Sequence, residues 1–283
     1  MSAETETVGL PDDADDLRGL HFRLLMGKGL TWVAIGVAVA AGLVAGASFF
    51  SPAIGAAAGV GALLLSLLAV FAIADSRSEG SFFEIYAQQR GLLLTGKSRL
   101  PGATPLLRKG DDRYAERLLT GPIADGFEGS LALYTYEEES TDSEGNSQTD
   151  YYRFTVGLID VPECAAFVPE LYCQRRFGLK ALEGLEDAFR KSRERVELES
   201  EALGDMYEIF SGDGQDANRL RQLFSPTFIV WLTDSAPKKF AFELVNGTLC
   251  CYVKGHKKNT GELDIVSQAS AAVATRLREE ATE

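Results

Sequence analysis

The longest apolar pattern in this chain covers residues 29–74, where no Asp, Glu, Lys or Arg occurs. A helix needs about 20 consecutive apolar residues to cross a bilayer, so this stretch is long enough for two crossings. Ser51-Pro52 near its middle favours a break, because proline lacks a backbone N–H and fixes φ. The pattern predicts two spans, 30–50 and 53–74, joined by a tight turn.

The energetics of insertion favour membrane spans over two alternatives. The Leu, Ile, Val and Phe side chains of either span together contribute about 3 to 6 kcal/mol to insertion. A buried hairpin of a soluble protein would carry a polar face, and these segments carry none. A cleaved signal peptide would have a shorter apolar run closer to the first residue, despite the small residues Ala45-Gly46-Ala47.

Basic residues indicate the orientation of the two spans. Arg18, Arg23 and Lys28 precede the first span, Arg77 and Arg90 follow the second, and the turn between them has no basic residue. Lys and Arg are retained on the cytoplasmic side of membranes. We therefore expect a two-span protein of the cell membrane with both termini in the cytoplasm.

Small residues recur within both spans. Gly42-x-x-x-Gly46 and Gly55-x-x-x-Gly59 match the spacing that lets helices approach closely. Two interpretations stay open: contact between the two helices of one hairpin, or association between chains. Because no ionisable residue lies inside the spans, they offer no proton relay or ion pathway, and we interpret them as an anchor.

The remaining residues predict an acidic tail and one soluble domain. Residues 1–17 are acidic with few large apolar groups, and we expect the tail over 1–28 to be disordered. Residues 75–283 are long enough for a cytoplasmic domain with its own core. They mix helix patterns with hairpin patterns, so the expected fold class is α+β, a transmembrane helical hairpin followed by a mainly antiparallel domain.

Alternating apolar residues and turn residues give the expected elements of that domain. A polar loop is expected over 138–150, and Asn246-Gly247 is a strong two-residue hairpin signal. The expected strands are 92–94, 114–122, 129–137, 151–161, 169–177, 196–199, 207–210, 239–245 and 248–253. The expected helices are 81–90, 179–191, one N-capped by Asp216, one beginning at Ser225-Pro226, and a closing helix capped by Asn259 or Thr260.

Composition excludes several classes of function. The 283 residues carry a net charge of −13, which argues against a nucleic-acid partner. Four cysteines are too few for a disulfide scaffold, and two histidines leave little room for a metal centre. The chain has no Walker A, GxGxxG, HExxH, CxxC or GxSxG motif. We therefore assign no catalytic residue, cofactor or metal.

Two basic clusters stand out against the acidic background. They are Arg175, Arg176 and Lys180, and Lys254, Lys257 and Lys258. Either they are solvated loops, or they attract anionic lipid headgroups at about 1 kcal/mol per residue. A third group, Glu197, Glu199 and Glu201, would share one face of a strand. Paired carboxylates can perform acid–base catalysis, but a solvated strand face is the simpler interpretation.

Four short motifs carry a resemblance to a known family. They are YAQQRGL from Tyr86, TPLLRKGDDR from Thr104, RVELES from Arg195 and LFSPTF from Leu223. They resemble a family of bacterial proteins in which a paired-helix anchor precedes a cytoplasmic α+β domain of unknown function. The resemblance covers about residues 80–280. It implies an inner-membrane protein and carries over no catalytic residue.

The leading functional hypothesis is a non-enzymatic, membrane-anchored binding or scaffold module. Its expected partners are the lipid bilayer and either another membrane protein or a second copy of the chain. One alternative is an enzyme that acts on a lipid or envelope precursor, which requires Asp111, Asp112, Arg113 and Glu116 to converge with distant residues. Another is a regulatory subunit that contacts a second membrane protein through its glycine-rich spans.

Overall fold

The computed structural model describes residues 13–124, 126–141, 145–176, 194–212 and 214–282. The chain divides into two compact units. The helical unit contains the residues up to Tyr86 together with Lys258–Thr260, and the sheet unit contains Ala87–Lys257 and Gly261–Glu283. The predicted helix over 179–191 and Lys180 lie outside the described residues.

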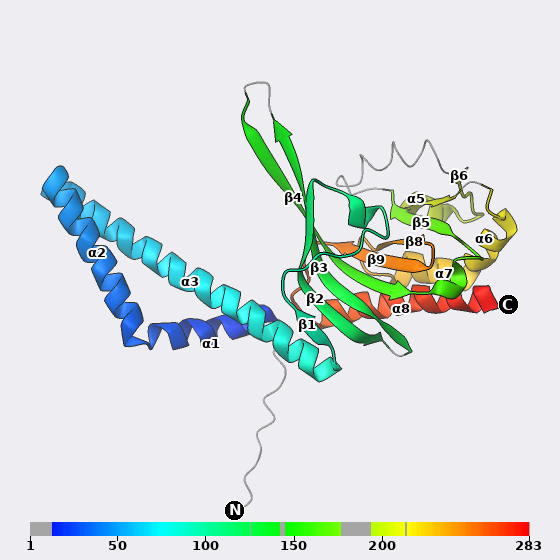
Figure 1. Cartoon of the computed structure of the whole chain (residues 1–283), viewed down its shortest axis with the longest axis horizontal. Coiled ribbons are helices and arrows are strands. Elements are labelled where there is room, and N and C mark those ends of the chain that lie inside the picture. Colours follow the sequence, from blue (N-terminus) through cyan, green and yellow to red (C-terminus); the bar gives the residue numbers. More distant parts are fainter. Residues whose placement is uncertain (1–12, 125, 142–144, 177–193, 213, 283) are drawn as a thin grey trace, which may run out of the picture. The chain divides into compact units, whose positions relative to one another are not determined.

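The helical unit begins with α1 (Ala14–Met26), where the sequence predicted a disordered tail over 1–28 (Figure 1). Asp13 and Asp16 form a capping box that satisfies backbone donors of the first turn. At the other end, Leu25 is buried with Ile35, Val70 and Ala74. The prediction was wrong for residues 14–26, because burial against distant helices stabilises a segment that is acidic in composition.

Two apolar helices follow, close to the predicted bounds. They are α2 (Gly29–Phe49) and α3 (Pro52–Arg90). Proline stands at the first position of α3, where its missing N–H costs no hydrogen bond. The predicted helix over 81–90 is not separate, because α3 continues without a break to Arg90. Gly91, with φ of +65°, follows the helix as expected.

Three residues from late in the chain complete the helical unit. The Ala14 N–H donates to the carbonyl oxygen of Lys258 over 3.1 Å. Asp13 forms an antiparallel bridge with Asn259. Lys258 Nζ lies 2.5 Å from Glu79 Oε2. These contacts fix the start of α1.

The sheet unit contains a nine-stranded sheet with the order β1-β2-β3-β4-β9-β8-β5-β7-β6. Every pair of neighbouring strands in it is antiparallel, which confirms the predicted α+β class. The strands are β1 (Leu93–Thr95), β2 (Asp112–Ala124), β3 (Phe127–Thr141), β4 (Ser147–Asp160), β5 (Glu170–Arg175), β6 (Glu194–Arg195), β7 (Tyr207–Ser211), β8 (Ala241–Val245) and β9 (Thr248–Lys254).

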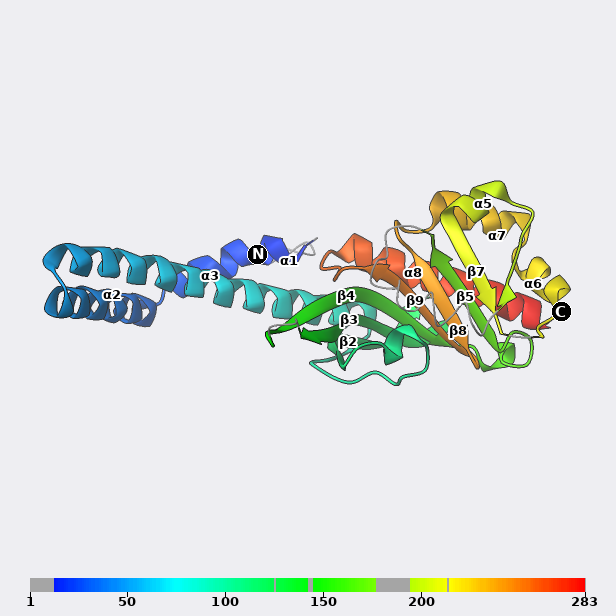
Figure 2. The same cartoon turned by 90° about the horizontal axis from the view of Figure 1, so that it is seen from above.

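Helix α8 (Thr260–Thr282) lies along one face of this sheet (Figure 2). Its buried side is the predicted one, with Val266, Ala269, Val273 and Leu277 in the core. Gly157 on β4 has no room for a side chain, because a Cβ there would collide with Ser270 of α8. The helix therefore packs directly on the strand backbone.

Shorter helical segments cover the rest of the sheet unit. The turn η1 (Leu106–Arg108) buries Leu106 and Leu107 against Tyr134, Phe154 and Tyr252 on the sheet. The others are η2 (Pro162–Cys164), α5 (Glu201–Met206), α6 (Ala217–Leu223), α7 (Pro226–Val230) and η4 (Trp231–Ser235). Asp216 caps α6 and Ser225 caps α7, as predicted.

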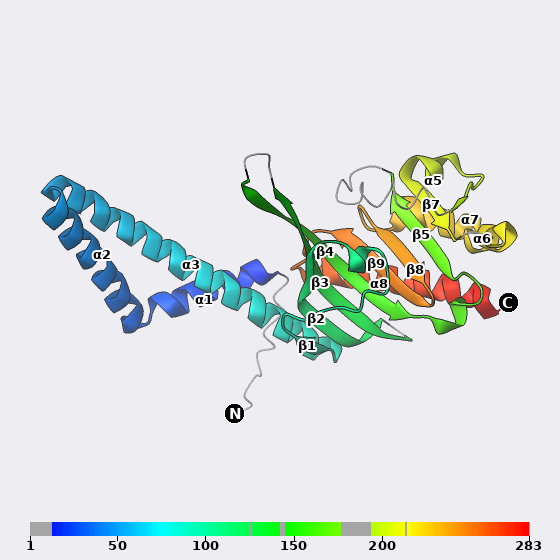
Figure 3. The ribbon, with the colours of Figure 1, turned by 45° about the horizontal axis from the view of Figure 1, so that its top comes forward.

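Two predicted elements differ from the structure. Within the predicted loop over 138–150, strand pairing continues to Thr141 and Ser147, so β3 and β4 form a long projecting hairpin (Figure 3). The predicted strand over 196–199 is wrong, since β6 ends at Arg195 and α5 begins at Glu201. The hairpin at Asn246-Gly247 is confirmed, with both residues at positive φ.

Candidate functional site

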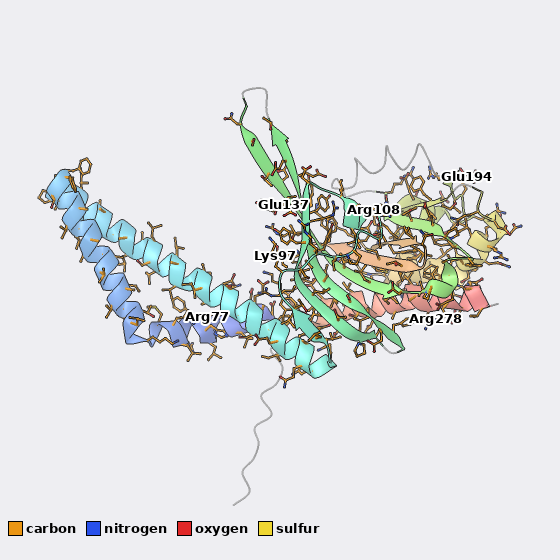
Figure 4. The ribbon with its side chains drawn as sticks, in the orientation of Figure 1. Arg77, Lys97, Arg108, Glu137, Glu194 and Arg278 are labelled. Atoms are coloured by element: carbon orange, nitrogen blue, oxygen red, sulfur yellow. The ribbon has the colours of Figure 1, made fainter. Side chains whose placement is uncertain are left out.

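The apolar surface of α2 and α3 is the clearest functional feature of the helical unit. Both helices are long and apolar enough to cross a membrane, and only 11% of the most apolar window of each is buried. In Figure 4 the side chains on α2 and on α3 ahead of Arg77 are mostly carbon. The exposed large apolar residues are Leu30, Trp32, Val33, Val37, Leu43, Val44, Phe49, Phe50, Ile54, Val60, Leu63, Leu64, Leu65, Leu68, Phe71 and Ile73. An apolar surface of this extent is unfavourable in water.

The glycines singled out from the sequence lie between α2 and α3. A Cβ on Gly46 would be 2.6 Å from the Cα of Gly55. A Cβ on Gly42 would be 2.9 Å from the carbonyl oxygen of Ala58, and one on Gly59 would be 2.7 Å from Leu43. These glycines therefore let the two helices of one chain pack backbone to backbone.

Polar side chains of the apolar helices bond to nearby backbone. Ser66 Oγ donates to the Ala62 carbonyl oxygen over 2.7 Å. Thr31 Oγ1 and Trp32 Nε1 each donate over 2.8 Å to carbonyl oxygens at the end of α1. Satisfying donors within the chain is what a lipid environment demands.

The first basic cluster is built into the sheet unit. The Arg175 guanidinium lies 4.5 Å above the ring of Tyr207. Arg176 donates to the Gly204 carbonyl oxygen over 3.1 Å, and its Nε is 3.9 Å from Glu208. Arg175 therefore contacts β7, and Arg176 contacts both α5 and β7. Lys180, the third member, lies outside the described residues.

The second basic cluster is largely ion-paired. Lys257 Nζ donates to Glu262 over 2.7 Å, within the sheet unit. Lys258 pairs with Glu79 inside the helical unit. Lys254, at the end of β9, is exposed. Two of the three lysines thus have an acidic partner, which lowers the positive charge available to a lipid headgroup.

Three of the residues required by the enzyme alternative, Asp111, Asp112 and Arg113, contact the loop before β2 and strand β3. Asp111 accepts the Glu139 N–H over 2.8 Å, and Asp112 accepts the Arg113 N–H over 2.9 Å. The Arg113 side chain donates to the carbonyl oxygen of Arg108, which lies on η1 (Figure 4). A cavity of about 170 Å³ adjoins this segment. Asp112 Oδ1 also lies 3.4 Å from Arg99 Nη2, so an exposed Arg–Asp pair lines this cavity.

Glu116 does meet distant residues, in a cluster that the sequence analysis missed. His256 Nε2 is 3.2 Å from Thr135 Oγ1 and 3.2 Å from the Tyr134 carbonyl oxygen. Thr135 donates to Glu116 over 3.1 Å, and His256 Nδ1 is 3.7 Å from the same carboxylate. The three residues come from β2, β3 and the loop after β9, so no sequence spacing links them.

Thr135 is fully buried within this cluster. His256 Nε2 donates to the Tyr134 carbonyl oxygen in the tautomer that carries hydrogen there, and it accepts from Thr135 in the other tautomer. The cluster fastens the loop before α8 to β3.

The three glutamates 197, 199 and 201 are exposed and do not share a strand face. Glu201 begins α5, and the other two lie in the irregular segment before it. They line a cavity of about 340 Å³ together with Arg176 and Arg195. A second cavity of about 470 Å³ adjoins Leu198 on the side of α7, with Phe224, Ile229 and Val230 in its wall.

The cysteines do not provide reactive thiolates. All four are buried and free. Burial raises the pKa of Cys164 to about 11 and raises the pKa values of the other three thiols further. Among the described residues, no group of three or more His, Cys, Asp or Glu side chains could hold a metal ion.

Comparison of the chain with protein-family models, with curated proteins and with solved structures finds no match.

Proposed function

We propose that this protein is a membrane-anchored binding or scaffold module. The hairpin of α2 and α3 spans the cell membrane twice, and the sheet unit works on the cytoplasmic side. The observation that carries the proposal is the extended apolar surface of these helices, most of which the described residues of the chain leave uncovered. The absence of charged residues from both spans supports an anchor over a transport pathway.

Fractionation tests the anchor. Membranes from cells that express the full chain are washed with high salt and then with alkaline carbonate, and the pellet is extracted with detergent. We expect the protein to stay in the pellet through both washes and to dissolve in detergent. Recovery in the aqueous supernatant would contradict the anchor.

Cysteine labelling tests the orientation. A membrane-impermeant maleimide should label Ser51→Cys, in the turn between the spans, in intact spheroplasts. It should label Ser140→Cys, on the β3–β4 hairpin, only after lysis. The wild-type chain is the blank, because its four cysteines are buried. Labelling of Ser140→Cys before lysis would contradict a cytoplasmic sheet unit.

Partner capture tests the binding role. The cavity beside α7 supports this role, because Val230 is a large apolar residue with 56% of its surface exposed. We expect mild crosslinking in membranes to join the full chain to a defined partner, and Val230→Asp to reduce this product. Leu93→Asp, at an exposed position on β1, is the matched control. Equal capture by both variants, or recovery of the protein alone, would count against the role.

The intrachain position of the glycines disfavours the regulatory-subunit alternative. Gly42, Gly46, Gly55 and Gly59 line the contact between α2 and α3 of the same chain, which supports the anchor over a contact with a second membrane protein.

A further inference from the structure

Helix α1 has one face packed within the helical unit. Leu25 is buried with Ile35 and Val70, and the Phe22 ring lies 6.4 Å from that of Phe71. Arg18 Nε donates to Asp75 over 2.6 Å. Because these partners lie on α2 and α3, α1 is held beside the end of the apolar hairpin.

The opposite face of α1 exposes large apolar side chains. Leu20 is 54% exposed and Leu24 is 55% exposed. The two residues are four positions apart, so their side chains lie on the same side of the helix. The apolar surface continues into α2, where Leu30 is 80% exposed and Trp32 is 55% exposed.

Charge is divided along α1. The acidic residues Asp13, Asp15 and Asp16 lie at its start. Arg23 in its last turn and Lys28 just beyond it are exposed and lie next to the apolar hairpin. A helix with an exposed apolar face and basic residues beside a membrane crossing suits the headgroup layer of a bilayer.

We propose that α1 lies in the headgroup layer of the cytoplasmic leaflet. Leu20 and Leu24 insert toward the acyl chains, and Arg23 and Lys28 contact the phosphate groups of anionic phospholipids. This inference rests on the proposed anchor, and it assigns lipid contact to α1 in place of the clusters at Arg175 and Lys254. The exposed apolar face of α1 is continuous with the apolar surface of α2. Because the proposed anchor places that surface in lipid, lipid rather than a protein covers the face of α1.

Depth-dependent fluorescence quenching tests this placement. Single cysteines at Leu20→Cys, Leu24→Cys and Asp16→Cys carry an environment-sensitive fluorophore, and the full chain is placed in nanodiscs that contain spin-labelled lipid. We expect lipid quenching at residues 20 and 24 to exceed that at residue 16 by about twofold or more. Val37→Cys, within the first span, is the reference for the anchor.

The reference separates the two proposals. Quenching at residue 37 without quenching at residues 20 and 24 would overturn the inference and leave the anchor intact. Loss of quenching at residue 37 would overturn the anchor itself. Protection of residues 20 and 24 from an aqueous quencher, without lipid quenching, would mean that protein covers α1 and would also overturn the inference.

Lipid charge tests the role of the basic residues. We expect quenching at residue 20 to be stronger in discs that contain phosphatidylglycerol than in discs of phosphatidylcholine alone. Arg23→Gln combined with Lys28→Gln should remove this difference. Lys238→Gln, at a lysine of the sheet unit, should retain it. A difference that survives the double substitution would overturn the assigned phosphate contact.

Discussion

At the scale of single residues, Glu243 has the smallest exposed fraction of the acidic residues described in the sheet unit. It is fully buried in the middle of β8. Its Oε2 accepts the backbone N–H of Leu106 over 3.0 Å, which ties η1 to the sheet. A buried carboxylate is costly unless its hydrogen bonds are made, so this contact matters for stability.

We expect Glu243→Ala to lower the free energy of unfolding by about 1 to 3 kcal/mol, because the Leu106 N–H loses its acceptor. Glu243→Gln keeps an acceptor oxygen and should cost less. Urea unfolding in detergent, followed by near-ultraviolet circular dichroism, measures both. The exposed Glu139→Ala is the control, and an equal loss in all three variants would contradict the role of the hydrogen bond.

Cys164 gives a prediction about pH. Burial raises the pKa of its thiol from 9.0 to about 11, so the folded protein holds this proton more tightly than the unfolded chain. The resulting stability is complete below about pH 9 and is lost as the pH rises toward 11. Thermal unfolding between pH 8 and 11 should therefore show a decline that is smaller in Cys164→Ala. A variant with the same decline would refute the assignment.

At the scale of elements, the contact between α2 and α3 depends on the absence of side chains. Gly46 and Gly55 face each other at a distance that a methyl group cannot enter. Gly36 and Gly61 lie in the same helices with nothing within 4 Å of an added Cβ. Gly36 and Gly61 can therefore serve as controls for Gly46 and Gly55. The comparison tests whether the glycines serve contact within one hairpin or association between chains.

We expect Gly46→Leu to lower the thermal stability of the hairpin in detergent, because overpacking costs about 1 to 3 kcal/mol. Gly36→Leu should leave it nearly unchanged. Light scattering of the same samples should give one oligomeric size for both variants and the wild type. A change in size without a loss of stability would favour association between chains.

Elements were predictable from sequence where the signal is local. The Pro52 break, the Ser225-Pro226 start and the Asn246-Gly247 hairpin all depend on neighbouring residues, and the structure has each of them. Helix α1 was missed although its Asp13–Asp16 capping box is a local signal, and the burial of Leu25 by α2 and α3 depends on contacts that no spacing encodes. The cluster of Glu116, Thr135 and His256 depends on strand pairing that no spacing encodes.

At the scale of the whole molecule, the two units differ in the solvent they suit. The helical unit exposes leucine, valine and phenylalanine along α2 and α3, whereas the sheet unit buries most of its large aromatic residues. Each apolar span contributes about 3 to 6 kcal/mol to insertion. Introducing a few charged residues into a span should therefore be enough to weaken membrane insertion.

We expect Leu64→Arg combined with Leu65→Arg to shift the chain from the membrane pellet toward aggregates or the soluble fraction. Each arginine near the centre of a span costs about 2.5 to 3.5 kcal/mol, which together offsets the gain from the span. Fractionation with immunoblotting measures the shift. Leu93→Arg, on exposed β1, should be released no more than the wild type, and release of no more of the double variant than of the wild type would contradict a contribution of the second span to anchoring.

The contacts of Lys258 and Asn259 with the first helix bear on the order of events during synthesis. The apolar hairpin leaves the ribosome before most of the sheet strands have been translated. The partners of Asp13 and Glu79 are translated only after all the sheet strands. Membrane insertion can therefore precede the formation of the contacts that hold the start of α1. A nascent chain released before Lys258 is translated lacks the residues that make these contacts.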